Sequence, residues 1–419
     1  MEVWHTFAIV MSENELIPHL FRTEYRKITA VLCKLFGFEH IEVAEDIASD
    51  TFLAASEIWG LKGLPENPVA WLYTVAKNKA RNFLKHENVF HNKVAKQLQH
   101  SGAGGEEPDI DLSVQNIKDS QLQMIFAICH PSIPLEAQIG LALRILCGFG
   151  ITEIADAFLT NKETISKRLV RAREKLREEN ITIEFPAPAE INKRLETVLT
   201  TLYLLFNEGY YSASDNSTLR KDLCLEAMRL TYLLMENDST DTPAVNALLS
   251  LMCFQSSRFD ARLDQSGEVV LYDDQDVSLW DKELIDKGSY FLHRASQGSQ
   301  LSKYHLEAGI AYWHTHKADT PEKWENILQL YNHLLQLEYS PVAALNRTYV
   351  LSKANGKAEA IIEAEKLALD PLFQYHLLLG ELYTGINNTR AAECFEKALT
   401  LTHSAADKKI IARKIGQCR

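Results

Sequence analysis

The sequence lacks the segments that mark membrane and secreted proteins. It has no run of about 18 apolar residues, so we expect no membrane-spanning helix. Its first ten residues lack a basic start, a sustained apolar run and a small-residue cleavage site, so we expect no secretion signal. The seven cysteines are scattered, with no Cys-x-x-Cys pair and no zinc spacing. This usage is typical of a cytoplasmic protein whose cysteines are small core residues.

Strand signals are nearly absent too. Helical periodicity covers most of the 419 residues, interrupted by Gly- and Pro-rich loops and by a Gly-rich, then acidic, segment at residues 101–109. The one exception is residues 268–272, which lie in a polar loop and which we expect to be extended. The pattern therefore predicts an all-α fold, long enough to hold more than one hydrophobic core.

Net positive charge is also missing. The chain carries 44 Lys and Arg against 56 Asp and Glu, a net charge of −12. Two windows depart from this balance: residues 72–96 hold six basic residues against one acid, and residues 161–177 hold seven against two, a net +5 in each. Two compact basic patches on an acidic chain are typical of a protein that contacts nucleic acid at two defined places. The alternative for either patch alone is a solvated helix face.

The strongest local motif lies at residues 150–173, where two short helices and a turn are predicted. Thr152 is expected to cap the first helix, and Thr160 with Glu163 to form a capping box that starts the second. The buried stripe of the second helix is expected to consist of Ile165, Leu169 and Leu176. Its other face carries Thr164, Lys167, Arg168 and Arg171. Such a face suits the major groove, which needs donors for base edges and cations for phosphates. The alternative is an ordinary helix pair with a charged outer side.

A further helix is predicted after the Pro-bounded loop at residues 60–68. Asn67 is expected to cap it, and Pro68 to be its first residue. Aromatic, polar and basic residues share this helix: Trp71, Tyr73, Lys77, Asn78, Lys79, Arg81 and Lys85. Rings that stack on bases and cations that hold the backbone are typical of single-stranded DNA binding. The alternative for Trp71 is a place in the core.

Residues 45–86 and 125–178 together resemble the extracytoplasmic-function (ECF) sigma factors, the minimal relatives of the housekeeping sigma factor. Residues 45–52, EDIASDTF, resemble the family's D-(I/L/V)-x-Q-(D/E)-T-F helix, with Ser49 where glutamine is usual. Residues 67–80 resemble the family's W-L-x-x-(I/V)-A-x-N pattern. Residues 186–419 are similar to an extension found in one subgroup, which usually carries DQDRSLWD where this chain has Val277 in place of the arginine.

This resemblance implies a partner for each region. The partners are core RNA polymerase, through its β′ clamp and β flap, and promoter DNA. Polymerase contacts are expected at Asp46, Asp50 and Phe52. Residues expected to recognise and open the −10 element are Asn67, Trp71, Tyr73, Lys77, Asn78 and Arg81. Residues expected to read the −35 element are Thr164, Lys167, Arg168 and Arg171.

The resemblance also predicts the domain organisation. Two small sigma helical domains are expected, one for core polymerase and the −10 element and one with the helix-turn-helix, followed by a helical extension. The predicted segments are a first domain at 11–87, a flexible linker at 88–116, a second domain at 117–180, a helical extension domain at 186–290 and a repeat region at 291–419. In the last region, residues 344–369 resemble residues 377–401 at an offset of 33, close to the 34-residue tetratricopeptide period, so we expect a tetratricopeptide-like solenoid.

The extension carries its own candidate site, at Tyr210, Asp273, Asp276 and Trp280. We expect it to regulate the protein or to contact polymerase, with a regulatory protein or a ligand as its candidate partner. Its carboxylates have no partner histidine and no metal spacing nearby, so the sequence predicts no enzymatic activity, no metal and no cofactor. A passive solenoid that only stabilises the chain is the alternative.

Two other function classes fit parts of the chain. One is a helix-turn-helix regulator with a tetratricopeptide sensor domain that acts without binding core polymerase. The other is a protein-interaction scaffold that binds no DNA. Residues 45–86 discriminate between them and the sigma factor, because a duplex-binding regulator has no use for that region.

Overall fold

The computed structural model describes residues 13–96, 110–158, 160–210, 220–264, 270–402 and 405–418, with the backbone alone at 13–15, 87–96 and 405–406. Helices and single helical turns make up all of the regular structure in these ranges, and no strand occurs there. The predicted all-α fold is therefore confirmed. None of the described helices combines the length and apolar character that crossing a membrane requires.

The chain divides into two compact units, Met1–Thr201 and Leu202–Arg419. The predicted division into five segments is finer than this and stays a prediction. Residues 97–109 of the predicted linker at 88–116 lie outside the described residues, and the prediction was wrong at 88–96 and 114–116, which are helical. On either side of it, one helix extends to Lys96 and the next begins at Val114.

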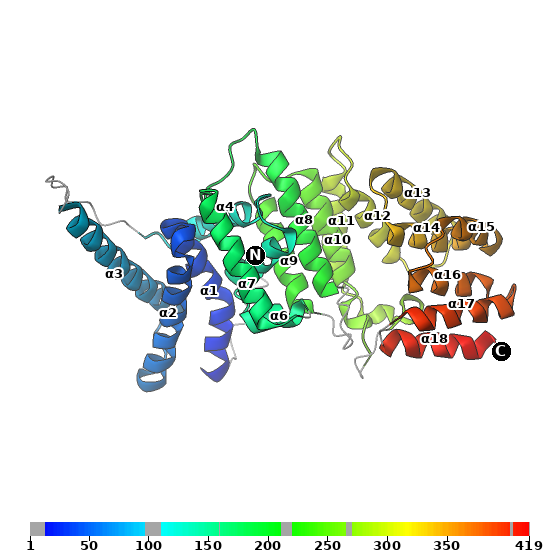
Figure 1. The fold of residues 1–419 in the computed structure, drawn as a ribbon, viewed down its shortest axis with the longest axis horizontal. Coiled ribbons are helices and arrows are strands. Elements are labelled where there is room, and N and C mark those ends of the chain that lie inside the picture. The colour runs from blue at the N-terminus through cyan, green and yellow to red at the C-terminus, as the bar shows by residue number, and fades with distance from the viewer. Residues whose placement is uncertain are drawn as a thin grey trace. The chain divides into compact units, whose positions relative to one another are not determined.

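Unit 1 is built from helices of very different lengths (Figure 1). They are α1 (Glu13–Phe36), η2 (Phe38–His40), α2 (Ile41–Lys62), α3 (Pro68–Lys96), α4 (Val114–Ile128), α5 (Leu135–Leu141), η3 (Ala142–Leu146), α6 (Ile151–Ala157) and α7 (Lys162–Glu178). Helix α1 packs against α2, α3, α4 and η3, while α7 packs against α5, α6 and η2. The helices thus share one core around α1.

Apolar residues at helical spacing explain why α2 packs as it does. Its buried side includes Ile41, Ala44, Ile47, Ala48, Phe52, Ala55 and Trp59, each 8% exposed or less. These positions recur every three or four residues and so lie along one stripe of the helix. Glu45 and Thr51 are buried as well, whereas Asp46 and Asp50 lie on the side that faces solvent.

Helix α8 (Ile191–Tyr210) crosses the boundary between the units. Its first half belongs to unit 1, where the Arg194 guanidinium donates to the Phe126 carbonyl and Thr201 Oγ1 donates to Gln138 Oε1 at 2.8 Å. Burial of the whole Gln138 side chain, 3% exposed, is tolerated because its amide nitrogen also donates to two carbonyls.

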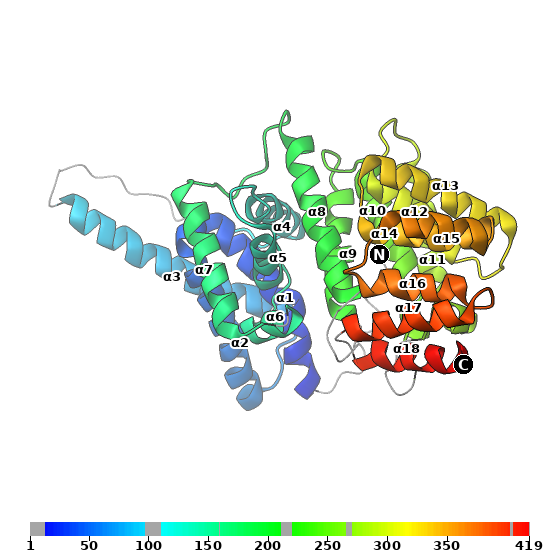
Figure 2. The same cartoon turned by 45° about the vertical axis from the view of Figure 1, so that its right-hand side comes forward.

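Unit 2 continues with helices that pack on their neighbours in the sequence (Figure 2). They are α9 (Lys221–Met235), α10 (Pro243–Ser256), η4 (Phe259–Ala261), η5 (Tyr272–Asp274), η6 (Val277–Leu279), α11 (Lys282–Ala295), α12 (Lys303–His314), α13 (Pro321–Leu337), α14 (Pro341–Ala354), α15 (Lys357–Leu367), α16 (Phe373–Tyr383), α17 (Asn388–Leu401) and α18 (Ala405–Cys418). Helices α10, α13 and α14 each begin with a proline after a Ser or Thr cap, a pairing that supplies an acceptor and removes an unpaired donor.

The expected extended segment at residues 268–272 is not a strand where it is described. Residues 268 and 269 lie outside the described residues, and Tyr272 begins the helical turn η5. The Val270 amide donates to the Arg262 carbonyl at 2.8 Å, and the Leu271 backbone is extended, so the expectation of an extended segment holds at Leu271 and ends at Tyr272.

Gly380 in α16 provides a test of packing in unit 2. A Cβ atom at this position would overlap the ring of Phe395, which is 1% exposed in α17. We expect Gly380→Ala to lower the free energy of unfolding of unit 2 by about 1–3 kcal/mol, because an overpacked core must shift. Denaturant titration followed by circular dichroism measures it.

The matched control is Gly416→Ala in α18, where a Cβ atom meets nothing within 4 Å. Alanine there is expected to raise the free energy of unfolding by about 0.5–1 kcal/mol, since glycine weakens a helix interior. Equal effects of the two substitutions would show that α16 and α17 do not pack as described.

Candidate nucleic-acid interface

The predicted helix-turn-helix corresponds to α6 and α7, whose caps lie two residues and one residue away from the predicted positions. Gly150, not Thr152, precedes α6, and its amide donates to Glu153 Oε2 at 2.7 Å. Asn161, not Thr160, caps α7, with its Oδ1 accepting from the Thr164 amide at 2.8 Å. The Thr160 amide instead donates to the Ala155 carbonyl inside the turn. The expected caps at Thr152 and Thr160 were therefore wrong, although the helices lie where predicted.

Helix α7 separates an apolar side from a polar side. Ile165, Leu169 and Leu176 are 3% exposed or less, which confirms the predicted buried stripe. Thr164, Lys167 and Arg171 are exposed. Arg168 is half-buried, and its guanidinium carbon lies 5.6 Å from the centre of the Phe158 ring. The four residues predicted to face DNA thus share one side of α7, and three of them are exposed.

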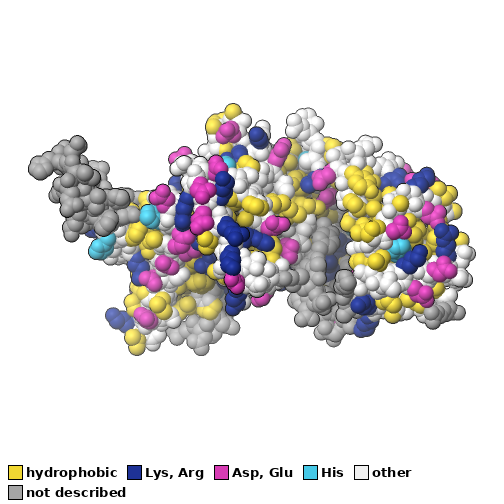
Figure 3. Space-filling view, viewed as in Figure 1, with side chains coloured by type: hydrophobic (Ala, Val, Ile, Leu, Met, Phe, Trp, Pro, Cys, Tyr) yellow, Lys and Arg dark blue, Asp and Glu magenta, His cyan; other side chains and the backbone are white. Residues whose placement is uncertain are grey.

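The basic patch on α7 is smaller than its sequence indicates. Lys167 pairs with Glu163 at 2.6 Å and Lys175 pairs with Glu179 at 2.7 Å, while Arg173 and Arg177 are bonded to groups of unit 1. Figure 3 shows the cationic and anionic side chains interspersed in this region. The cations of α7 without a carboxylate partner among the described residues are Lys162, Arg168 and Arg171.

Helix α3 starts as predicted, with Asn67 Oδ1 accepting from the Ala70 amide at 3.0 Å. Trp71 is half-buried and meets Trp59 of α2 edge to face, with ring centres 5.4 Å apart. Part of this indole therefore stays accessible, while the adjacent Leu72 is fully buried.

Tyr73 points into unit 1. Its hydroxyl donates to Glu24 Oε2 of α1 at 2.6 Å, and Glu24 is 5% exposed. Burial, together with this bond to a carboxylate, raises the pKa of the Tyr73 phenol. In this position the ring is half-buried and supports α3 rather than offering a stacking platform.

Further along α3, the predicted −10 residues are Lys77, Asn78 and Arg81. Asn78 is exposed, and the other two are half-buried. Lys79 between them pairs with Asp50 of α2 at 3.2 Å. Lys93 and Lys96, which complete the predicted basic patch, have side chains outside the described residues.

On α2 the predicted polymerase residues fall into two classes. Asp46 and Asp50 are exposed, as a docking surface requires. Phe52 is 4% exposed, and its ring centre lies 5.1 Å from that of Phe21 and 6.5 Å from that of Tyr25. The Phe52 side chain is therefore part of the core and can contribute to docking only by holding α2 in place.

In unit 2 the predicted extension residues are linked through side chains that the sequence did not single out. Arg258 donates to the Tyr210 hydroxyl at 3.3 Å and lies over the Tyr272 ring, 5.5 Å from its centre. The ring centres of Tyr272 and Trp280 are in turn 6.1 Å apart. Tyr210 and Trp280 are about 5% exposed, so both are anchors, whereas Asp273 and Asp276 face solvent.

Two lysines hold the loop that carries these aspartates. The Lys317 ammonium donates to the carbonyls of Tyr272, Asp273 and Gln275 at 2.6, 2.9 and 3.4 Å. The ammonium of Lys323, a residue 1% exposed, donates to the Tyr272 hydroxyl at 3.0 Å and to the His316 carbonyl at 2.6 Å. These hydrogen bonds fix the loop, because each one satisfies a carbonyl or hydroxyl oxygen that would otherwise need a water molecule.

We name the residues of this arrangement the Tyr272 cluster: Arg258, Tyr272, His314, Lys317 and Lys323. Sequence reasoning missed its cations because a single Lys or Arg in a turn, a loop or a helix carries no local pattern. Around the cluster the fixed loop exposes acidic and apolar side chains together. They are Leu271, Asp273, Asp274, Asp276, Val277 and Leu279. A rigid surface of this composition suits contact with another protein.

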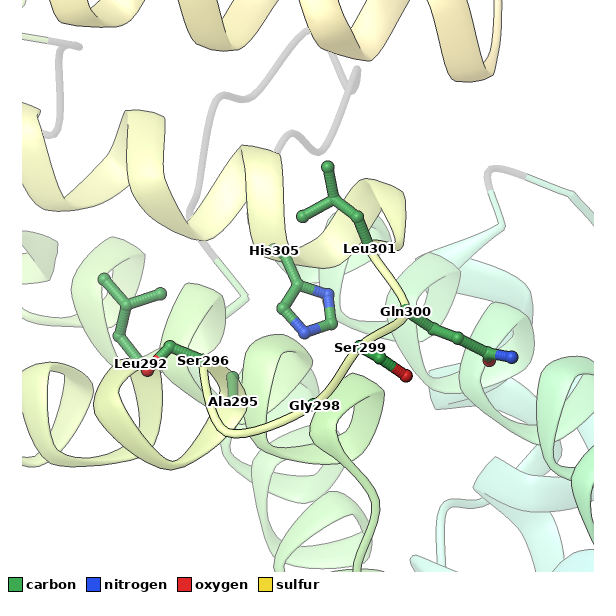
Figure 4. Close-up of a pocket in the computed structure, with 8 residues that line it drawn as sticks. All are labelled: Leu292, Ala295, Ser296, Gly298, Ser299, Gln300, Leu301 and His305. Atoms are coloured by element: carbon green, nitrogen blue, oxygen red, sulfur yellow. The ribbon is translucent and has the colours of Figure 1, made fainter.

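A pocket of about 420 Å³ lies elsewhere in unit 2, between the end of α11 and the start of α12 (Figure 4). The residues that line it are mostly small and uncharged. The Nδ1 atom of His305 is hydrogen-bonded to the Ser302 hydroxyl at 2.8 Å. Among the described residues, no group of His, Cys, Asp and Glu is placed to hold a metal ion. Within the described residues, therefore, neither the lining of this pocket nor a metal-binding group indicates a catalytic site.

Comparison with known proteins gives two matches. Residues 194–296 match the model of a family of unknown function, DUF6596. The chain is also similar to the uncharacterized protein R00370 of Rhizobium meliloti (strain 1021), with 32% identity over 394 residues that cover 90% of each chain. No solved structure matches the chain. The DUF6596 match includes Tyr210, Trp280 and two members of the Tyr272 cluster, Arg258 and Tyr272, but not His314, Lys317 or Lys323.

His314 makes the stability of unit 2 sensitive to acid. Its burial, with Arg258 and Lys323 nearby, lowers the pKa of the imidazole to about 3. The unfolded chain takes up this proton near pH 6.5, so it binds more protons than the folded chain below that pH. We expect the free energy of unfolding to fall as the pH is lowered from about 6.5 towards 3.

Substitution of His314 by Phe tests this expectation, because it keeps an aromatic ring against Tyr272 and Trp324 and removes the titrating group. Thermal unfolding between pH 4 and pH 7 should then depend less on pH than in the unmodified chain. His333→Phe, at an exposed position of α13, is the control. An unchanged pH dependence in His314→Phe would contradict the account.

Proposed function

The chain belongs to the same protein family as R00370 of Rhizobium meliloti, and we propose that it is a cytoplasmic sigma factor of the ECF type. It binds core RNA polymerase and directs initiation of transcription at specific promoters. The observation that carries the proposal is the exposed polar side of α7, with Thr164, Lys167 and Arg171, in the same unit as the α2–α3 pair. A duplex-reading helix alone fits any regulator, and the α2–α3 pair adds the second DNA contact and the acidic docking surface.

The contacts of α7 support reading of the −35 element. Its N-terminal half presents Thr164, Lys167, Arg168 and Arg171 on one side, which is the half that enters the major groove in a helix-turn-helix. The opposite side is held by Ile165 and Leu169 in the core. A firmly seated helix with a free donor-rich side fits direct readout of base edges.

The α2–α3 pair supports the other two contacts. Asp46 and Asp50 give α2 an exposed acidic side for the β′ clamp, while Asn67, Asn78 and the accessible part of Trp71 give α3 a polar and aromatic side for the −10 element. Lys77 and Arg81 supply charge for the phosphates. Tyr73 and Phe52 act by position, since both are packed inside unit 1.

Unit 2 is proposed to be the tetratricopeptide-like extension, which regulates the sigma factor or contacts polymerase. Support for the repeat comes from two successive helix pairs, α14–α15 and α16–α17. They lie at the two segments that resemble each other at an offset of 33 residues. Gly380 and Phe395 let α16 and α17 approach closely. Support for a protein contact comes from the fixed acidic and apolar loop beside the Tyr272 cluster.

Transcription in a purified system tests the function. DNA fragments are first selected from genomic DNA by the chain mixed with core polymerase, and run-off transcripts are then measured with and without the chain. Specific transcripts that require both components are the expected result. A footprint on duplex DNA by the chain alone, with no core-dependent transcript, would instead identify a regulator that acts without polymerase.

Arg171→Gln tests the role of α7 directly. We expect it to weaken binding of the holoenzyme to a selected promoter by about 1–3 kcal/mol, the usual contribution of a side chain that contacts a base. Fluorescence anisotropy titrations of labelled promoter measure the change in Kd.

The control is Lys175→Gln, which removes the same charge from an exposed position of α7 that pairs with Glu179. It should leave promoter binding nearly unchanged. If the two variants bind equally well at unaltered helix content, α7 does not read DNA through the side that we propose.

A further inference from the structure

Helix α18 carries positive charge in a unit that is otherwise acidic. Its 14 residues include four Lys and Arg and one Asp, a net +3. Residues 202–404, the rest of unit 2 before this helix, carry 17 Lys and Arg against 28 Asp and Glu, a net −11. The charge of α18 is therefore opposite to that of the unit in which it is packed.

One side of α18 holds the helix in unit 2. Ile411 is fully buried, and Ile415 and Cys418 pack against the hydrophobic core of this unit. Lys414 lies on the same side of the helix, where its ammonium pairs with Glu381 of α16. One of the four cations of α18 thus serves the packing of the helix.

The other three cations share the exposed side of α18, and we name Lys408, Lys409 and Arg413 the α18 patch. Neither Lys408 nor Arg413 forms an ion pair with a described residue. At about 100° per residue, the three side chains fall within an arc of about 140°, with Ala412 and Gly416 between them. A Cβ atom at Gly416 would meet nothing within 4 Å. The patch is thus cationic and open, so an extended anion can approach it closely.

Helix α18 is the last helix of the stack, and it packs chiefly against α17 (Figures 1 and 2). The end of a helical stack needs a polar outer face to stay soluble, and charges of both signs fulfil that need. Helix α17 has such a mixture, with Glu393, Glu396 and Lys397 all exposed. The charged residues exposed on α18 are cations alone, which indicates an anionic partner.

The composition of α18 favours nucleic acid over other anionic partners. A helix that binds a membrane surface needs large apolar side chains that reach the lipid, and those of α18 pack in the core. A protein partner would find no aromatic or large apolar anchor among the residues of the α18 patch. The backbone of duplex DNA needs cations only, because its phosphates are the groups that are bound without regard to sequence.

The chain connection keeps unit 2 near any DNA that α7 binds. Twelve residues separate Glu178, the end of α7, from Ile191, the start of α8, and they span at most about 40 Å. Helix α8 then continues into unit 2. A weak contact on a short tether acts at a high effective concentration. Three cations are therefore enough to add affinity to a complex that α7 has already formed.

We propose that the α18 patch is a third DNA contact, which binds the phosphate backbone of the duplex. The position of this contact on a promoter rests on the proposed function, because α7 delivers the duplex. The contact is independent of base sequence, since it is made to phosphates. It is confined to α18, because the net charge of −11 on the preceding part of unit 2 repels DNA.

The salt dependence of promoter binding tests the patch in the full-length chain with core polymerase. The variant combines Lys408→Gln, Lys409→Gln and Arg413→Gln. Each lost phosphate contact should lower the slope of log K against log salt by about 0.9, so three should lower it by about 2.7. Between about 50 and about 200 mM salt, the unmodified complex should then lose about 40-fold more affinity than the variant. Fluorescence anisotropy titrations measure this difference, which should be the same on duplexes of unrelated sequence.

Two matched variants separate the patch from the net charge. The triple change Lys282→Gln, Lys287→Gln and Lys366→Gln removes three charges from exposed positions of α11 and α15 and should leave the slope unchanged. Lys408→Arg with Lys409→Arg should also retain the slope, because a phosphate contact requires charge. An unchanged slope in the α18 variant, or equal shifts in the two triple variants, at unaltered helix content, would overturn the proposal.

Crosslinking locates the contact without relying on transcription. A photoreactive amino acid replaces Ala412, within the patch, and the full-length chain is irradiated with duplex DNA at low salt, alone and with core polymerase. We expect a crosslink to DNA of any sequence from position 412, and none from the exposed Ala358 position on α15. A crosslink from position 412 to a polymerase subunit and not to DNA would overturn the proposal in favour of a protein partner. Binding to vesicles that contain phosphatidylglycerol, without a DNA crosslink, would overturn it in favour of a membrane.

Failure of this contact and failure of the sigma-factor function give different results. If the chain does not bind core polymerase but position 412 crosslinks to duplex DNA, the sigma-factor function is wrong and the contact of α18 stands. If Arg171→Gln weakens promoter binding while the α18 variant keeps the slope of the unmodified chain, the function stands and the contact of α18 is wrong.

Discussion

The contact between Arg173 and Glu45 is the constraint on which the arrangement of unit 1 depends. It joins the helix that is proposed to read DNA to the helix that is proposed to dock on polymerase, and it does so in the interior, where neither charge has water as an alternative partner. The exposed sides of α2, α3 and α7 have fixed relative positions because of this contact. Their spacing is consequently set in part by the two carboxylates of Glu42 and Glu45 and the three guanidiniums that they bind.

Ion pairs within unit 1 also reduce the number of free positive charges in the two basic patches below what the sequence indicates. Of the seven basic residues at 161–177, two are bonded to α2 or to a backbone carbonyl and two are paired with Glu163 and Glu179. On α3, Lys79 is paired with Asp50. The remaining cations are few and discrete, which fits a protein that reads DNA at defined points while the net charge of −12 limits binding elsewhere.

Local sequence patterns were enough to predict the helices and their buried sides. Helical periodicity located the stripe of Ile165, Leu169 and Leu176, and turn chemistry located the start of α3 at Asn67 and Pro68. The caps of α6 and α7 were misplaced by one or two residues. Several residues near each end can accept a hydrogen bond, and only the backbone geometry decides that Asn161 reaches the Thr164 amide.

Long-range partners could not be predicted in this way. Tyr73 was expected to face DNA, but its hydroxyl finds Glu24, 49 residues earlier in the chain. Arg173 was counted as part of a basic patch, but its partner Glu45 is 128 residues away. The lysines of the Tyr272 cluster likewise come from outside the acidic loop: Lys317 follows α12, and Lys323 lies in α13. In each case a side chain that looks like a solvent-facing polar residue in the sequence is recruited by tertiary packing.

Site-specific photocrosslinking tests the central claim most directly. A photoreactive amino acid replaces Asp46 on the exposed side of α2, and the purified chain is irradiated with core RNA polymerase at low salt. The account predicts a crosslink to the β′ subunit that disappears when an excess of another sigma factor is present. No crosslink to β′ from Asp46, with the protein folded and polymerase active, would contradict the claim that this chain is a sigma factor.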